Sequence, residues 1–400
     1  MKKTFHKFIL TALAIALPTI ANAQFSEDGY YRVESVEIGQ TLYIKSGKAQ
    51  DINYSTGMSI NIANIRGLLD KTAKYSTPST IINISKYIPL QGINGETRVE
   101  LGAQGITTKN ITGVDAKLFL VATKTKDVYK AAAEYKSGRT YLRATESYDD
   151  TKEEDQDGEV ITGADDEYST FKITKVDESS NYFGIKPRVE LDGAYYDPFY
   201  VAFPYSFSST GMKAFKVDKI SEVKDGKAYV IYSEVNASGI APGTPLIVKC
   251  SSNKPENNKL KINGVTGQTI SYNGNFKGAY RSCPEPEDIR DVVTYDKYTM
   301  RILGTDNGKL VFKKSSTKKY IDENEAYLVV GKNYPDVLEL VTQSEYDNIT
   351  GIDDITVDEV SVNPRVKGVY TIAGVRVADT KDFDKLPSGV YIVDGKQRTK

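Results

Sequence analysis

The chain has 400 residues, and its 52 basic and 53 acidic residues leave a formal net charge of −1. This balance provides no basic surface of the kind that binds nucleic acid, so a nucleic-acid partner is not expected. The length exceeds what one ordinary hydrophobic core supports, and two or three domains are therefore predicted.

The amino terminus has the features of a cleavable secretory signal. Lysines among the first seven residues precede an apolar stretch at residues 8–20, which is followed by the small-x-small sequence ANA. Signal peptidase requires this order of charge, apolar segment and small residues. We predict a signal over residues 1–23 with cleavage between Ala23 and Gln24; the alternative is an N-terminal core helix. No later segment has the length and apolar character of a membrane span, so no transmembrane segment is expected after signal removal.

Histidine and cysteine usage limits the available chemistry. The only histidine, His6, belongs to the predicted signal, which excludes a Ser-His-Asp or Cys-His arrangement and any histidine-based metal site in the mature chain.

The acidic residues 149–159 alternate as in a calcium loop, but no glutamate stands six places after their glycine, so a solvated loop is predicted. We predict no metal and no cofactor. The two cysteines, Cys250 and Cys283, are predicted to form a disulfide in an exported protein, with two buried unpaired thiols as the alternative.

Residues 24–180 are predicted to form β-strands. The segment 29–36, GYYRVESV, alternates apolar and polar residues and precedes a turn and a second such segment, which predicts a hairpin. A similar phrase returns at residues 138–144, GRTYLRA. These phrases resemble the opening of β-trefoil domains, and the resemblance implies a β-trefoil-like domain over residues 24–180. Only residues 61–74 have the apolar spacing of a short helix.

The next region, residues 181–347, is also predicted to be β. Short apolar strands recur between turns such as Asn307-Gly308, so an antiparallel β-sandwich-like domain is expected. The most aromatic stretch, residues 195–207, lies within this region. If this stretch is a strand, its odd positions face the core, whereas Tyr196 and Tyr200 form an exposed pair that could stack against a sugar or contact a partner. The alternative is that both tyrosines are ordinary residues of a half-buried β surface.

Two resemblances bear on where the protein is located. The phrases YYDPFYVAFPYSF, GIAPGTPLIVKCSS and YIDENEAYLVV resemble a module of uncharacterised secreted β-rich proteins of Bacteroidetes. After an acidic linker at residues 348–359, the phrases GVYTIAGVRV and LPSGVYIVDGK are similar to the final strands of type IX secretion sorting domains. This second resemblance implies that residues 360–400 are a short β-hairpin segment that contacts the secretion machinery. The alternative is a terminal hairpin that pairs onto the preceding domain.

No catalytic residue is predicted. A glycosidase needs two carboxylates of different pKa, and nothing in the sequence singles out a pair among many. A Ser-x-x-Lys spacing at Ser315 and Lys318 recurs twice elsewhere without companion motifs, so chance explains it. We therefore predict an all-β, non-catalytic protein that binds a glycan or a host or matrix protein, or has a structural role. It would be secreted, at the extracellular or outer-membrane surface, with the periplasm as the alternative location. The alternative function is a histidine-free carboxylate hydrolase acting on polysaccharide.

Overall fold

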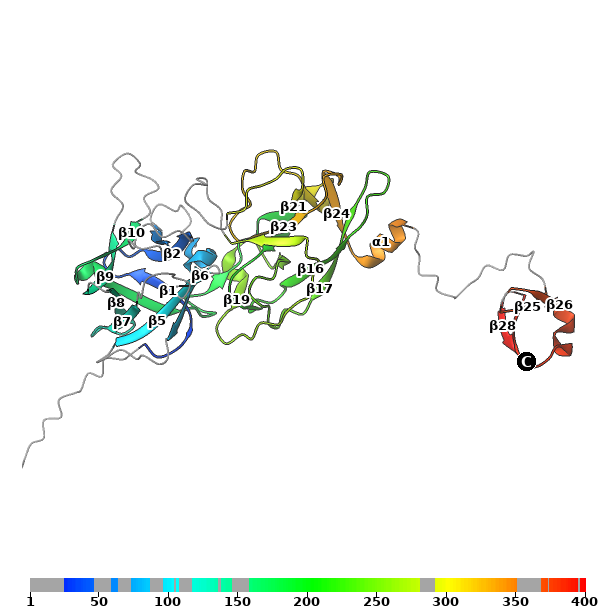
Figure 1. The fold of residues 1–400 in the computed structure, drawn as a ribbon, viewed down its shortest axis with the longest axis horizontal. Coiled ribbons are helices and arrows are strands. Elements are labelled where there is room, and N and C mark those ends of the chain that lie inside the picture. Colours follow the sequence, from blue (N-terminus) through cyan, green and yellow to red (C-terminus); the bar gives the residue numbers. More distant parts are fainter. Residues whose placement is uncertain are drawn as a thin grey trace, which may run out of the picture. The chain divides into compact units, whose positions relative to one another are not determined.

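The structure, a computed structural model, shows a chain built mostly of β-strands, which confirms the predicted all-β class (Figure 1). The only α-helix in the part that it describes is α1 (Gln343–Thr350). The chain divides into two compact units, residues 1–340 and 341–400. The described residues are 25–46, 59–63, 73–86, 96–103, 106–107, 117–135, 138–145, 158–280, 292–350, 368–372, 374–394 and 396–400.

Six strands near the amino terminus pair antiparallel in a closed ring, because β11 pairs both with β8 and back with β1. In order around the ring they are β1 (Gly29–Ser35), β4 (Ile82–Lys86), β5 (Glu96–Ala103), β7 (Lys117–Ala122), β8 (Val128–Tyr135) and β11 (Thr170–Lys175). Further strands extend from it: β2 (Thr41–Ser46) with β3 (Ser59–Ala63), β9 (Gly138–Thr145) with β10 (Gly158–Gly163), and β6 (Ile106–Thr107) beside β5. The closed ring has no unpaired edge strand.

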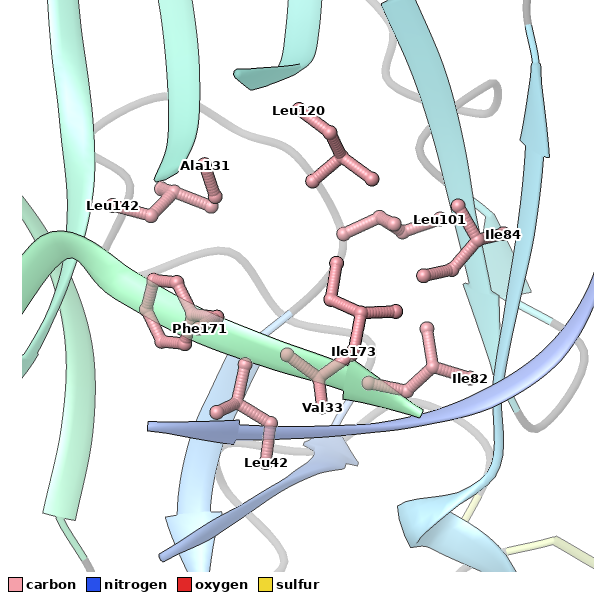
Figure 2. A pocket seen from close by; sticks show the side chains of 10 residues that line it. All are labelled: Val33, Leu42, Ile82, Ile84, Leu101, Leu120, Ala131, Leu142, Phe171 and Ile173. Carbon is pink, nitrogen blue, oxygen red and sulfur yellow. The ribbon is translucent and has the colours of Figure 1, made fainter. Parts of the chain in front are cut away.

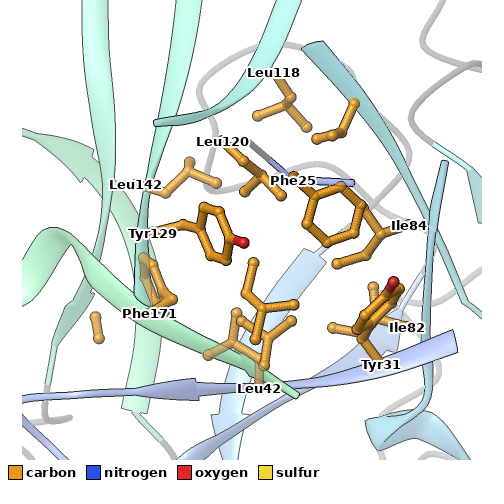
Figure 3. Close-up of a cluster of buried hydrophobic side chains, with 14 of the residues drawn as sticks. Phe25, Tyr31, Leu42, Ile82, Ile84, Leu118, Leu120, Tyr129, Leu142 and Phe171 are labelled. Carbon is orange, nitrogen blue, oxygen red and sulfur yellow. The ribbon is translucent and has the colours of Figure 1, made fainter. Parts of the chain in front are cut away.

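Apolar side chains fill the inside of this ring (Figure 3). Tyr31 and Val33 of β1 and Phe171 and Ile173 of β11 belong to this core, with the period of two expected for residues on one strand face. Arg32, on the other face of β1, is also buried and donates to the Thr80 hydroxyl. A cavity of about 30 Å³ remains among them (Figure 2). It is lined only by apolar residues: Val33, Leu42, Ile82, Ile84, Leu101, Leu120, Ala131, Leu142, Phe171 and Ile173. No polar group there can hold a water molecule, so the cavity is a small packing defect of the core.

The prediction of a short helix over residues 61–74 is wrong at both ends of this range, where the structure has a strand and a 3-10 turn. Asn61 and Ile62 pair with Tyr43 and Leu42 as part of β3, and Ala73–Tyr75 form a 3-10 turn. Residues 64–72 lie outside the described ranges. Cross-strand pairing with β2 outweighs a helical spacing that is only a weak local preference.

A second ring forms from residues after 193. It contains β14 (Ala194–Phe199), β18 (Leu246–Cys250), β16 (Lys213–Ile220), β17 (Tyr229–Val235), β24 (Val337–Val341), β22 (Lys309–Lys313), β21 (Met300–Asp306) and β23 (Glu325–Val329). The antiparallel strands predicted here are present, and the predicted turn at Asn307-Gly308 joins β21 to β22 with both residues at positive φ. The ring closes where β14 meets β23 through the single pair Phe199↔Glu325. Beyond the ring, β13 (Val189–Leu191) pairs with β14 and β20 (Phe276–Ala279) pairs with β23.

This second ring packs on both of its faces. Its inner face encloses a core that includes Ile247, Phe276 and Phe312. Its outer face, at β14, β16 and β18, packs against a small sheet of β12 (Phe183–Gly184), β19 (Lys259–Lys261) and β15 (Ser206–Phe207), with Phe199 and Val248 between the layers. Strands of this ring are therefore apolar at both odd and even positions, as expected for strands that are covered on both sides.

Direct contacts join the two β regions within the first unit. The Asn263 side chain accepts a hydrogen bond from the Tyr30 N–H at 2.9 Å and donates to the carbonyls of Tyr30 and Val176 at 3.0 and 2.9 Å. The rings of Tyr75 and Tyr182 stack with their centroids 4.6 Å apart. These contacts come from residues more than 80 positions apart and make the first unit one folded body.

The second unit contains a sheet of four strands in the order β26-β25-β27-β28. The strands are β25 (Val369–Thr371), β26 (Arg376–Ala378), β27 (Val390–Val393) and β28 (Lys396–Thr399). The predicted C-terminal hairpin is therefore part of a larger sheet. The predicted linker at residues 348–359 begins inside α1, which extends to Thr350, and residues 351–367 lie outside the described ranges.

Candidate functional site

Of the two tyrosines that the sequence predicts as an exposed pair, Tyr196 lies in β14 and Tyr200 directly follows this strand. Tyr195 and Phe199 face the outer core, as predicted for the odd positions. Tyr196 and Tyr200 are half-buried and pack against the inner core of the second ring. The two tyrosines are therefore half-buried and not an exposed pair, which agrees with the alternative of ordinary residues on a half-buried β surface. Whether either tyrosine binds a ligand stays a prediction.

Tyr200 instead packs with Tyr280, and we call these two residues the tyrosine cluster. The rings of Tyr200 and Tyr280 lie with their centroids 4.5 Å apart and their planes inclined by 31°. Tyr272, on the segment before β20, is 37% exposed. Tyr280 follows β20 directly, so the cluster brings together the ends of two strands that are far apart in the sequence.

The backbone holds Tyr200 in place. Its N–H donates to the carbonyl of Asn324 at 3.1 Å, and its own carbonyl accepts from the Asn324 side-chain amide at 2.8 Å. Asn324 is buried and adopts a φ of 58°, in the left-handed region that asparagine tolerates better than most residues. The Tyr200 ring lies directly over Gly278, where a Cβ would be 2.0 Å from Tyr200 Cγ. Only glycine at position 278 leaves room for the ring.

The hydroxyls of Tyr280 and Tyr272 stay protonated. Burial raises the pKa of Tyr280, and a hydrogen bond with the Tyr200 side chain raises it further. Burial also raises the pKa of the more exposed Tyr272. Because the ordinary pKa of tyrosine is already about 10, these hydroxyls are neutral hydrogen-bonding groups at physiological pH.

A second polar group, the seam network, lies where β14 meets β23 and consists of Arg188, Asp197, Lys318 and Glu325. Arg188 Nη1 lies 3.2 and 3.1 Å from the two carboxylate oxygens of Asp197. Lys318 Nζ lies 2.5 Å from Glu325 Oε2. Asp197 and Glu325 are 1% and 3% exposed, and burial outweighs Arg188 and raises the pKa of Asp197 to about 7, with Glu325 contributing to the rise.

The seam network does not have the arrangement of a glycosidase site. Hydrolysis needs two carboxyl groups that face each other across a cleft and reach both substrate and water. Asp197 and Glu325 are enclosed by protein, and each is paired with its own cation. A buried ion network of this kind orders the strands around it, and its titration bears on stability.

Serine and lysine at the Ser315-x-x-Lys318 spacing do not form a catalytic pair. The Ser315 hydroxyl oxygen accepts from the main-chain N–H groups of Thr317 and Lys318. Lys318 Nζ is bound to Glu325 and to Asp322, so its partners are these carboxyl groups and not the Ser315 hydroxyl.

Of the two cysteines in the predicted disulfide, only Cys250 lies among the described residues. Cys250 ends β18, is buried in the outer core and has a free thiol, whose pKa is raised by burial. Cys283 lies outside the described residues, so a bond between the two stays a prediction. The predicted cleavage site at Ala23 and Gln24 lies outside them as well, as does most of the acidic stretch 149–159.

The described residues contain neither a cluster of metal ligands nor a helix of membrane-spanning length. No group of three or more Cys, Asp, Glu or His side chains among them is arranged to hold a metal ion. None of the helices that are described is long and apolar enough to cross a membrane.

The sequence missed Tyr280 as the partner of Tyr200, because their proximity depends on how β20 joins the ring. One local signal was available: Gly278 interrupts a strand, and glycine there often marks the close approach of another group. Comparison of the chain with descriptions of protein families, with curated proteins and with solved structures yields no match.

Proposed function

We propose that the chain is a secreted or surface-associated, non-catalytic protein that binds a glycan. The observation that supports this most directly is the contrast between its polar groups. The tyrosine cluster offers neutral hydroxyls and a partly exposed ring, as aromatic sugar-binding sites do, whereas the buried carboxylates Asp197 and Glu325 are enclosed and paired. Protein binding, a structural role and polysaccharide hydrolysis are the competing functions.

The experiment is a glycan-array screen of residues 24–400, with product analysis on every glycan that is retained. Retention of particular glycans without turnover supports the proposal, and the heat-unfolded chain serves as the control for non-specific retention. Cleavage of a retained glycan would contradict the proposal and support the alternative function, a carboxylate hydrolase acting on polysaccharide. The absence of retention on a broad array would favour a protein partner or a structural role.

For the fold we propose a β-trefoil over residues 24–180 and a sandwich-like second domain over residues 181–347. The trefoil is supported by the six-strand ring, by the hairpins β2–β3 and β9–β10 between ring strands, and by β6 at the place of the third hairpin. The sandwich-like domain is supported by the small sheet that packs over β14, β16 and β18.

For export we propose that residues 1–23 are removed and that residues 360–400 direct the chain to the cell surface through the type IX machinery. The basis is the sequence resemblance and the presence of a small separate unit at the carboxyl end. Mass spectrometry of the exported protein should find Gln24 as the first residue. In a host with that machinery, deletion of residues 360–400 should abolish surface location and leave glycan binding intact.

A further inference from the structure

The second ring has one weak point in its strand pairing. β14 pairs with β18 through five residue pairs, and β23 pairs with β21 through three, whereas β14 meets β23 at the single pair Phe199↔Glu325. Parts of a fold with few local contacts open at a lower free energy than the whole molecule. The junction of β14 and β23 is therefore the place where the ring depends most on contacts other than the strand ladder.

Arg188 supplies such contacts from one side of the junction to the other. It directly precedes β13 and is attached to β14, because its N–H donates to the Tyr196 carbonyl at 3.1 Å. Its Nη1 lies 3.2 and 3.1 Å from the Asp197 carboxylate oxygens and donates to the Asn324 carbonyl at 3.3 Å, and its Nη2 donates to the Glu323 carbonyl at 2.7 Å. One planar guanidinium thus holds β14 to the turn that leads into β23.

The junction also encloses an acidic side chain from each strand. Asp197 of β14 and Glu325 of β23 are 1% and 3% exposed, and Glu325 is paired with Lys318. An ionised Asp197 is attracted by Arg188 but repelled by Glu325, and burial adds a further cost. Burial and repulsion together outweigh the attraction, so an ionised Asp197 is more stable in water, which it reaches when the junction opens.

The groups on neighbouring elements do not offset this cost. Cys250 of β18 and Tyr205 interact electrostatically with Asp197, and both stay neutral because burial raises their pKa. Asp322 pairs with Lys318 and adds negative charge on the β23 side. The charge on Asp197 therefore decides how firmly β14 and β23 are held together.

We propose that the junction of β14 and β23 is a pH-sensitive conformational switch, in which Arg188 holds the second ring closed and ionisation of Asp197 favours local opening. The pKa of Asp197 is about 7 in the closed ring and returns to its ordinary value of 3.8 once water reaches the side chain. Between these values each opening releases a proton, so the population of the open form should rise about tenfold per pH unit. The ring is accordingly closed in acid and opens more often towards neutral pH.

The Tyr200 N–H reports on the switch, because it donates to the Asn324 carbonyl across the junction at 3.1 Å. Its protection factor is measured by native-state hydrogen exchange of residues 24–400 between about pH 4.5 and 6.5, corrected for the intrinsic exchange rate at each pH. We expect protection to fall about tenfold per pH unit in the parent chain and to stay constant in Asp197→Asn. Dilute urea should hardly change it, because local opening exposes little surface.

A second variant tests the role of Arg188. Arg188→Lys keeps the charge, but its single nitrogen cannot bind Asp197 and Glu323 at the same time. At about pH 4.5 it should lower the protection of the Tyr200 N–H about fivefold, as for the loss of one hydrogen bond. Arg139→Lys is the matched control, because Arg139 binds Glu96 through two nitrogens in the first ring, and it should leave this protection within about twofold.

Three results would overturn parts of the proposal. If the Tyr200 N–H exchanges with the equilibrium constant of global unfolding in urea at every pH, the ring does not open locally and the switch is wrong. If local opening does not depend on pH, or still depends on pH in Asp197→Asn, Asp197 does not control it. If Arg188→Lys protects the Tyr200 N–H as well as the parent chain does, Arg188 does not hold the junction closed.

Discussion

The buried carboxyl of Asp197 should make the protein less stable as the pH rises from acidic to neutral. Burial raises the pKa of Asp197 from 3.8 to about 7 in the folded chain. Between these two values the unfolded chain has released the proton and the folded chain still holds it, so the free energy of unfolding decreases as pH rises. Each pH unit corresponds to about 1.4 kcal/mol, which gives a loss of about 4 kcal/mol between pH 4 and pH 7 from this group.

Asp197→Asn removes the ionisation and keeps the shape. At about pH 4.5 the variant should be close to the parent in stability, because the amide replaces a protonated carboxyl. At about pH 8 it should be more stable relative to the parent by about 3 kcal/mol, since the amide carries no buried charge. Urea unfolding of both proteins, followed by circular dichroism at several pH values, measures this difference, and the contributions of other titrating groups cancel.

Glu234→Gln is the matched control. Glu234 is about half exposed and pairs with the equally exposed Lys213 on the neighbouring strand, so its removal should change stability by about 0.5 kcal/mol or less at every pH. If the curves of Asp197→Asn and the parent run parallel from about pH 4.5 to pH 8, then Asp197 is ionised in the folded chain throughout, and attraction by Arg188 outweighs burial.

Three further predictions concern packing, the thiol and the contact between the β regions. Phe171→Ala, in the buried core beside the 30 Å³ cavity, should lower the free energy of unfolding by about 3–5 kcal/mol in chemical denaturation, and a loss under 1 kcal/mol would contradict the packing described here. Cys250 should be unreactive to a thiol reagent in the native protein and reactive in denaturant without reductant; a thiol that appears only after reduction would demonstrate the bond to Cys283. Asn263→Ala, which removes three hydrogen bonds, should cost about 1–3 kcal/mol and speed hydrogen exchange at Tyr30 and Val176, whereas unchanged exchange at both would show that apolar packing alone holds this contact.

Local patterns in the sequence were sufficient for the β class and for several strands. The alternation in residues 29–36 corresponds to β1, and Asn307-Gly308 forms the predicted turn, because side-chain alternation and turn chemistry are properties of a few neighbouring residues. The same local reasoning failed at residues 61–74. There the helical spacing of apolar residues could not reveal that β2 would supply a pairing partner.

The candidate site shows what the sequence by itself determined and what only the tertiary structure decided. The sequence was enough to exclude histidine chemistry, and it identified Tyr196 and Tyr200 as residues on the same strand face, because composition and the period of two do not depend on distant residues. It could not show that the face is covered, since the closure of β14 against β23 joins residues 126 positions apart. That closure, with β20 added beside it, brings Tyr200 to Tyr280, and it also buries Asp197. Such contacts depend on strand order and register, which are set by packing of the whole domain and are not encoded in any short stretch of the chain.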